Sequence, residues 1–227
     1  MKIAILSDIH GNSYALKTVL KKIKEKNIKK ILILGDMIGY YYGIDILDQL
    51  KEFDCEFIAG NHELMLKDVL DKKINIEVIT KKYGKGLEYV FKKSSKTDID
   101  FYYNLDTYKI ITIDNMKLGL FHGSPKKNDE YIYPDTDYDK LKSMCKNFDY
   151  IFIGHTHYPF TFTHNKTTLI NTGSVGQNRY EGGIACWVLF DTENKTIQFM
   201  NNKYNIMHLI NEIEDDDNPY LKDVLMR

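Results

Sequence analysis

The sequence predicts an α/β fold in which parallel strands are covered by helices, and three observations predict it. Short apolar runs alternate with amphipathic stretches through the first quarter of the chain, which is typical of parallel sheets. Polar side chains directly follow several of these runs. With 227 residues, 43% of them apolar, the chain can build one sizeable core, so we expect a single domain over residues 1–227.

The first half repeats the order strand, loop, helix. Residues 2–7 form a short apolar run, and residues 14–23 then place apolar side chains at helical spacing. The pattern recurs as a strand at 30–34, a loop at 35–43, a helix at 44–53, a strand at 55–59 and a loop at 60–63. Residues 64–104 are mixed and charged, and we expect them to be mainly helical and to form a candidate cap segment.

The second half contains more strands and fewer helices. Residues 108–113 and 116–121 flank Asp114-Asn115, a pair that favours a hairpin turn. A helix at 139–148 leads into a strand at 150–153. Further strands are expected at 160–163, 168–170, 184–190 and 196–200, so this half should be richer in antiparallel pairing.

The charge balance gives no global field that would hold nucleic acid. Lys and Arg number 31 against 32 Asp and Glu, for a net charge of −1. A lysine-rich stretch at 17–30 and an acidic segment at 212–217 are expected to be solvated faces or tails.

Cysteine usage and hydropathy indicate a soluble cytoplasmic protein with no membrane partner. The three cysteines are odd in number and widely spaced, which fits neither a disulfide framework nor a thiolate zinc site. The apolar run at the N-terminus is too short for a signal peptide, and no stretch approaches the roughly 18 apolar residues of a membrane span. The sequence leaves the oligomeric state open.

Two pairs of candidate metal ligands follow strands. Asp8 and His10 are separated by one residue, and an extended backbone would send their side chains to the same side, where one ion can contact both. His155 and His157 repeat that spacing after the strand at 150–153, in Gly-His-Thr-His.

Three further candidate ligands follow other strands. Asp36 has two carboxylate oxygens and is therefore the candidate to bridge two ions. Asn61 offers a carbonyl oxygen after the third strand, and His122 follows the strand at 116–121. Ligands of α/β sheets gather at the carboxyl ends of strands, so a metal site is expected there.

Each residue alone has an ordinary alternative. A single Asp at a strand end is usually a turn or helix cap, and a single His is usually a polar surface or core residue. Here, however, five of the seven histidines lie at or beside glycine directly after predicted strands, and only His164 and His208 fall outside. The set as a whole therefore favours a metal centre.

These motifs resemble those of the calcineurin-like metallophosphoesterases. The matching residues, in order, are Asp8-Ile9-His10, Gly35-Asp36, Gly60-Asn61-His62, His122 and Gly154-His155-Thr156-His157. The closer resemblance is to a small bacterial and archaeal phosphodiesterase branch and covers residues 1 to about 200. It is carried by Ser7–Asn12, Gly35–Tyr40, His122–Pro125 and Asn171–Gln177.

The resemblance implies a four-layer αββα sandwich with two mixed sheets and a centre of two divalent ions. One ion would be held by Asp8, His10, Asp36 and His157, and the other by Asp36, Asn61, His122 and His155. Asp, Asn and His without Cys suit manganese, iron, nickel, cobalt or zinc, and manganese is our first choice.

The implied activity is hydrolysis of a phosphate ester, with a phosphodiesterase as the first expectation. A hydroxide between the two ions would be the nucleophile, and His62 would be the general acid that protonates the leaving group. A phosphomonoesterase or a dinucleotide polyphosphatase would use the same centre. An alternative of another class is a catalytically silent interaction scaffold, as in the retromer subunit that resembles this branch.

The chain departs from the serine/threonine phosphatases of the superfamily, which carry Asp-Arg-Gly where it has Gly39-Tyr40-Tyr41. Arg179 is a candidate to bind phosphate and Glu63 to orient His62, while surface ion pairs are the alternative for both. Tyr40, with the stretches 40–42 and 101–103, forms either aromatic walls for substrate or ordinary core. Asn12 and Ser13 either contact substrate or cap the following helix, and we favour the cap.

Overall fold

The computed structural model describes all residues 1–227, and its strands form two five-stranded sheets. The first sheet has the order β10-β9-β1-β2-β3 and the second β4-β5-β6-β8-β7. The strands are β1 (Lys2–Leu6), β2 (Lys30–Ile33), β3 (Asp54–Phe57), β4 (Tyr108–Ile113), β5 (Met116–Phe121), β6 (Tyr150–Ile153), β7 (Phe160–His164), β8 (Thr167–Asn171), β9 (Ile184–Asp191) and β10 (Thr196–Lys203).

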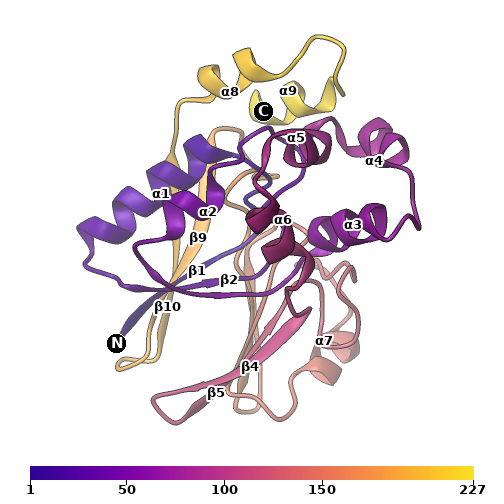
Figure 1. The fold of residues 1–227 in the computed structure, drawn as a ribbon. Coiled ribbons are helices and arrows are strands. Elements are labelled where there is room, and N and C mark those ends of the chain that lie inside the picture. The colour runs from indigo at the N-terminus through magenta and orange to yellow at the C-terminus, as the bar shows by residue number, and fades with distance from the viewer.

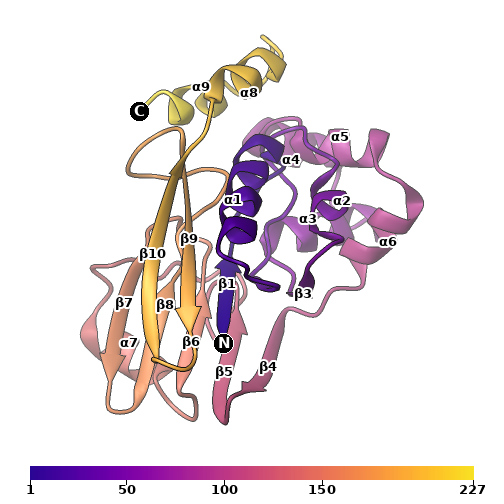
Figure 2. The same cartoon turned by 90° about the vertical axis from the view of Figure 1, so that its left-hand side faces the viewer.

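Helices cover the outer faces of both sheets. They are α1 (Ser13–Glu25), α2 (Ile46–Leu50), α3 (Asn61–Leu70), α4 (Ile76–Tyr83), α5 (Gly86–Lys93), α6 (Lys96–Tyr103), α7 (Tyr138–Met144), α8 (Ile206–Glu212) and α9 (Tyr220–Leu225). Figure 1 shows α1 to α6 gathered on one side of the molecule, and Figure 2 shows α7 on the far side, beyond the second sheet. The expected αββα sandwich is therefore confirmed.

Both sheets are mixed, as expected, and antiparallel pairing is concentrated in the second half of the chain, as predicted, although that half also contains a parallel centre. In the first sheet β1, β2 and β3 are parallel, and β9 and β10 add antiparallel strands. In the second sheet β5, β6 and β8 form a parallel centre, with antiparallel β4 and β7 at its edges. The reason is that α7 connects β5 to β6, and such a crossover returns the chain in the same direction.

Alternation along the strands divides the apolar residues between two sides of the first sheet. In β1, Ile3 and Ile5 belong to a core between the two sheets, whereas Ala4 and Leu6 belong to the larger core under the helices. A third core lies between α7 and the second sheet. Each layer of the sandwich thus buries its own apolar face.

The candidate cap segment, 64–104, consists of helices, as expected from its sequence. Its buried residues join the core to which α1 also contributes; they are Leu66, Ile79, Leu87, Val90 and Tyr102. This shared core packs the segment against the helical side of the first sheet. The predicted hairpin is also present: Asp114 and Asn115 both have positive φ, 48° and 61°, as a tight turn between β4 and β5 requires.

The C-terminal segment forms helices that the sequence reasoning did not anticipate. The acidic stretch at 212–217 is not simply a solvated tail. The Asp217 carboxylate accepts hydrogen bonds from the Lys85 backbone and the Tyr42 hydroxyl, and Glu214 pairs with the Lys85 ammonium at 2.7 Å. These contacts hold the turn between α8 and α9 against the start of α5, and Figure 1 shows α9 near α5. None of the helices is both long and apolar enough to span a membrane.

Candidate metal centre

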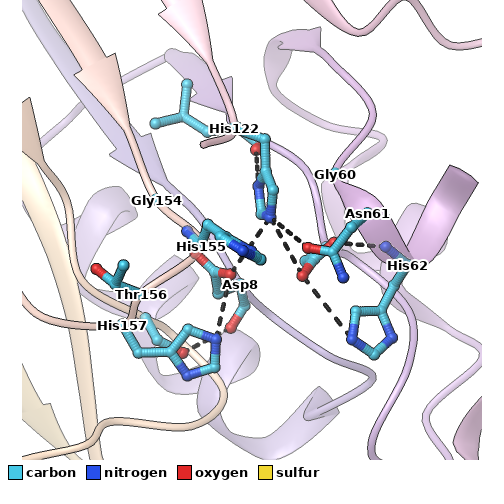
Figure 3. Close-up of polar contacts among 12 residues, drawn as sticks. Asp8, Gly60, Asn61, His62, His122, Gly154, His155, Thr156 and His157 are labelled. Atoms are coloured by element: carbon cyan, nitrogen blue, oxygen red, sulfur yellow. Dashed lines mark hydrogen bonds and ion pairs between the residues drawn. The ribbon is translucent and has the colours of Figure 1, made fainter. Parts of the chain in front are cut away.

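The seven predicted metal ligands converge in one place, at the carboxyl ends of strands from both sheets. Figure 3 shows the labelled side chains around a common space. Five of them are almost completely buried, with at most 2% of each residue exposed, and Asn61 and His155 are partly buried. The buried ligands are Asp8, His10, Asp36, His122 and His157.

Five of these residues adopt left-handed backbone conformations. Their φ values lie between 52° and 65°; the residues are Asp8, His10, Asp36, His155 and His157. We expected an extended backbone to bring the two ligands of Asp-x-His, and of His-x-His, to the same side. That expectation was wrong, because the backbone of each segment turns sharply once its strand has ended. Such conformations are unfavourable for non-glycine residues by about 1–3 kcal/mol each and are found where function fixes them.

The glycine before the paired histidines provides space rather than a special φ. A Cβ on Gly154 would lie 2.0 Å from the Ser7 hydroxyl and 2.5 Å from the Asp8 carboxylate. The absence of a side chain lets the β6 loop approach the β1 loop. The backbone N–H of His155 then donates to Asp8 Oδ2 at 3.0 Å, which joins the two loops.

One group of candidate ligands comprises Asp8, His10 and His157. The Nε2 atoms of the two histidines are 3.0 Å apart, and His157 Nε2 lies 3.2 Å from Asp8 Oδ1. His157 Nδ1 donates to the Gln177 carbonyl at 2.7 Å, which leaves the lone pair of Nε2 directed at the cluster. Two imidazole nitrogens this close require a proton or a cation between them.

A second group comprises Asp36, His122 and His155. His122 Nε2 lies 3.3 Å from Asp36 Oδ2 and 3.1 Å from Asn61 Oδ1. Its Nδ1 donates to the Leu34 carbonyl at 2.7 Å, so this imidazole is also held with Nε2 facing the centre. Asp36 Oδ2 is 3.7 Å from His10 Nε2 as well, which places Asp36 between the two groups.

The electrostatics of the cluster favour a cation. Burial would raise the pKa of Asp8 and of Asp36, but the neighbouring histidines hold both below their usual value. Burial would lower the pKa of His122, but these two carboxylates raise it to about 10. A positive charge is thus required beside the carboxylates, and either a proton or a metal ion supplies it.

The donor set fits divalent metal. Burial lowers the pKa of His10 and lowers that of His155 to about 4, so both are neutral near pH 7, as metal ligands must be. The buried atoms Asp8 Oδ1 and His155 Nε2 have no hydrogen-bond partner within the protein. Such orphaned atoms are costly unless a ligand satisfies them.

Glu63 organises the Asp36 loop and makes no hydrogen bond to the His62 imidazole, which corrects the expectation for this residue. Its buried carboxylate accepts hydrogen bonds from the backbone N–H groups of Asp36, Met37, Ile38 and Gly60 at 2.8–3.3 Å. Burial and the charge of Asp36 raise the pKa of Glu63 to about 7. Glu63 therefore fixes the loop that carries the central carboxylate.

His62, the candidate general acid, lies at the start of α3 with 2% of its surface exposed. The side chains of His62 and Asn61 point in different directions because both residues lie in the first turn of α3. The sequence suggested another reason, the alternation of side chains along an extended backbone. Its backbone N–H donates to Asp36 Oδ1 at 2.8 Å, and its Nε2 lies 4.0 Å from Asp36 Oδ2. Together with His10 and Asp36 it forms a third group within reach of a cation.

The centre opens into a cavity of about 430 Å³ whose wall includes His62, Tyr40 and Arg179. Arg179 Nε lies 3.3 Å from His157 Nδ1, and its guanidinium packs on the Tyr220 ring at 5.4 Å. Arg227 packs on the same ring at 5.5 Å and also lines the cavity. These are the only two arginines in the sequence, a signal in the composition that could have pointed to Arg227.

The aromatic walls differ from those expected. Of the stretches 40–42 and 101–103 only Tyr40 lines the cavity, because Tyr41 and Tyr102 are core residues and Tyr42 stacks on Tyr89. The other tyrosines in the wall are Tyr83, Tyr131, Tyr133, Tyr158 and Tyr220. Only Tyr158 had a signal in the sequence, since it directly follows His157.

Asn12 caps the following helix, as favoured from the sequence. Its Oδ1 accepts a hydrogen bond from Ala15 N at 3.0 Å, and its Nδ2 donates to the Gly176 carbonyl at 2.8 Å. Ser13 pairs with Asp45 instead of facing the cavity. Neither residue lines the site.

Comparisons with known proteins agree with this geometry. The model of the calcineurin-like phosphoesterase superfamily domain matches residues 1–195. An uncharacterised protein of Methanocaldococcus jannaschii is 30% identical over 225 residues, covering 90% of this chain and 88% of its own. A probable metallophosphoesterase of the same organism is 35% identical over 75 residues, 32% of this chain and 36% of its own.

Solved structures share the fold. A hypothetical protein from Pyrococcus horikoshii superposes with a TM-score of 0.87 at 20% identity, covering 100% of this chain and 98% of its own. A metallophosphoesterase from Sphaerobacter thermophilus does so with a TM-score of 0.81 at 22% identity, covering 99% and 98%. From the family match and the relative of nearly equal length, we conclude that this chain belongs to the calcineurin-like phosphoesterase superfamily.

Proposed function

We propose that the chain is a metal-dependent phosphodiesterase. The observation that carries the proposal is that overlapping groups of buried ligands, joined through His10 and Asp36, open into a cavity lined by both arginines of the sequence. Neutral imidazoles and carboxylates would hold two cations, and the guanidiniums would bind the anionic ester.

The two ions would be held as the sequence predicted, with Asp36 between them. Asp8, His10 and His157 surround one position, and Asn61, His122 and His155 the other. Donors of this kind suit manganese first, and iron, nickel, cobalt or zinc as alternatives. Bound divalent ions supply Lewis acidity and lower the pKa of water near neutral pH.

His62 is proposed as the general acid. It lies on the cavity wall beside Asp36, and the ring centroids of Tyr40 and His10 are 5.0 and 4.8 Å from its own. Burial lowers the pKa of His62, and the carboxylate of Asp36 opposes this shift and so favours the protonated ring. From this position the protonated ring would deliver its proton to the leaving oxygen of an ester bound at the ligand groups. The proton transfer would matter most for leaving groups of high pKa.

Arg179 and Arg227 are proposed to bind the non-bridging oxygens of the ester. Both guanidiniums pack on Tyr220, and this packing limits their freedom before substrate arrives. A planar guanidinium binds phosphate oxygens in a bidentate manner, which lysine cannot do. No lysine lines the cavity, although lysines outnumber arginines by far in the sequence.

The breadth of the cavity favours a diester over a monoester. A monoester carries one substituent, whereas this cavity has aromatic walls from the 40–42 loop, the 123–137 loop and α9, which can contact groups on both sides of a phosphate. An archaeal phosphodiesterase shares the fold with a TM-score of 0.53 at 18% identity. A phosphomonoesterase or a dinucleotide polyphosphatase is the runner-up.

The test compares bis-p-nitrophenyl phosphate with p-nitrophenyl phosphate as substrates of the manganese-loaded protein, before and after chelation. We expect turnover of the diester to exceed that of the monoester and to vanish on chelation. Preference for the monoester would support the runner-up. No turnover of either ester by protein with two bound ions would favour an interaction scaffold. His208→Ala serves as a matched control, because this histidine lies outside the ligand groups.

A further inference from the structure

A chain of tyrosine rings extends from the metal centre to the surface. We call it the tyrosine strip; it consists of Tyr131, Tyr133, Tyr158 and Tyr180. Tyr131 contacts the ring of the ligand His155, with centroids 4.3 Å apart. Successive contacts then follow at 5.9, 5.9 and 4.9 Å. The strip comes from three loops, at 123–137, 154–159 and 172–183.

The rings of the strip are exposed to solvent, whereas a monomeric protein usually buries its large contiguous apolar surfaces. Tyr131 is 57% exposed, Tyr133 39% and Tyr180 63%. Single exposed aromatic residues are ordinary, but a contiguous row connected to a cavity indicates a binding surface. Three of the four rings line the cavity that contains the ligand groups, and Tyr133, Tyr158 and Tyr180 also line an adjoining groove.

The shape of the strip selects its occupant. The rings of Tyr131 and Tyr133 stack on each other, nearly parallel at 9°, and so offer flat aromatic faces beside hydroxyl groups. The strip carries no aliphatic side chain and no full charge, and the adjoining groove adds only Pro134 and one carboxylate, Asp135. A lipid tail or a charged peptide would therefore gain little from it, whereas a planar uncharged ring can stack on it.

We propose that the tyrosine strip binds the base of a nucleoside attached to the scissile phosphate, so that the substrate is a nucleotide ester. This inference rests on the proposed function. With the phosphate at the ligand groups and the guanidiniums, the nucleoside extends past His155 onto Tyr131 and Tyr133. Stacking is tolerant of base identity, so the strip selects nucleotides over simple esters without selecting one base.

The test uses two esters with the same leaving group. Thymidine 5′-(p-nitrophenyl phosphate) and methyl p-nitrophenyl phosphate both release p-nitrophenolate, and only the first carries a base. With manganese-loaded protein, kcat/KM for the thymidine ester should exceed that for the methyl ester by roughly tenfold or more, through KM. Tyr133→Ala should reduce this ratio several-fold, and Tyr133→Phe should retain it because the ring remains.

A matched control separates the strip from general damage. Tyr138→Ala removes a tyrosine that is more exposed than Tyr133, 56% against 39%, but packs on Phe162 and His164 and does not line the cavity. It should leave the ratio unchanged. Equal kcat/KM for the two esters in the wild-type protein would overturn the inference. So would a ratio that Tyr133→Ala does not change.

A binding measurement distinguishes failure of this inference from failure of the proposed function. Calorimetry with manganese-loaded protein compares thymidine 5′-monophosphate with methyl phosphate as ligands. Tighter binding of the nucleotide, weakened by Tyr133→Ala, would support the strip even in a protein that hydrolyses neither ester. Equal affinity for the two ligands would refute the strip, whatever the turnover.

Discussion

His10 and His157 lie with their Nε2 atoms 3.0 Å apart, although 147 residues separate them in the sequence. His10 follows β1 of the first sheet, and His157 follows β6 of the second. Asp36 follows β2 of the first sheet, and it contacts His122, which follows β5 of the second sheet. The candidate metal centre therefore joins the two sheets of the sandwich.

Because the centre joins the sheets, metal removal should destabilise the whole fold. A ligand that binds only the folded state stabilises it by about 3–4 kcal/mol when present at 100 to 1,000 times its Kd. We expect the midpoint of thermal unfolding to fall on chelation and to recover with manganese, as measured by circular dichroism. His157→Ala should show a smaller rise in unfolding temperature with manganese than the wild type, because only the position at Asn61, His122 and His155 remains intact. His164→Ala, outside the centre, should respond like the wild type.

His62→Ala should separate metal binding from turnover. If His62 is the general acid, the variant should keep two bound ions, as counted by elemental analysis, and lose turnover by roughly 100-fold or more on an ester with an alkyl leaving group. Loss on p-nitrophenyl esters should be smaller, because p-nitrophenolate leaves without a proton. Equal losses on both classes of ester, or loss of one ion, would instead make His62 a ligand of the third group.

Glu63→Gln tests the organisation of the Asp36 loop. The substitution keeps the size of the side chain but replaces one of its two acceptor oxygens with an N–H donor. That donor would face backbone N–H groups that now donate to the carboxylate. We expect a loss of about 2–4 kcal/mol in the free energy of unfolding, measured in urea. Glu88→Gln, at an exposed ion pair with Lys92, should change it by less than about 1 kcal/mol. Equal stability of the two variants would refute the role of Glu63.

How far the sequence predicts this protein depends on whether a feature is local. Strand positions, the hairpin at Asp114-Asn115 and the Asn12 cap follow from patterns within a few residues, and the structure confirms them. The ligands could be named because each follows a strand. Their geometry could not: the left-handed φ of Asp8 and His155 depends on hydrogen bonds and close approaches between different loops.

The substrate side of the cavity was harder to predict for the same reason. Tyr131 and Tyr133 lie in a long loop with no periodic pattern, and Tyr220 and Arg227 belong to a C-terminal segment that had no motif. Contacts with distant segments fix its position, through Asp217 with Lys85 and through the core residues Leu221 and Val224. Contacts between distant segments carry no signature in one sequence.

The metal-free protein should lose stability between pH 7 and pH 9. The carboxylates of Asp8 and Asp36 raise the pKa of His122 from 6.5 to about 10. A base whose pKa is raised by folding contributes stability that is complete below its unfolded pKa and is lost as the pH rises through its folded pKa. Chelated protein should therefore be less stable at pH 9 than at pH 7, by on the order of 2 kcal/mol in urea titrations.

Two controls accompany this pH dependence. With manganese bound, the ions replace the proton of His122, so the loss of stability between pH 7 and pH 9 should disappear. In the chelated His122→Asn variant it should also disappear, because the titrating group is gone. A chelated wild-type protein whose stability is the same at pH 7 and pH 9 would contradict the charge requirement of the centre.

Gly39→Ala should reproduce the loss of His62 function without changing His62. Gly39 has a φ of +136°, and a Cβ at this position would lie 2.3 Å from His62 Nδ1. The methyl group must therefore displace either the imidazole or the Gly39 loop, and displacement of a proton donor by about 1 Å can reduce turnover by roughly 100-fold. We expect metal content to be retained and turnover of alkyl esters to fall, as in His62→Ala. Combining the two substitutions should add little, since both act through the same imidazole. Additive losses in the double variant would show that Gly39 acts on another part of the site. Gly84→Ala controls for backbone strain alone, because it also replaces a glycine with positive φ, at the end of α4 beside Leu221.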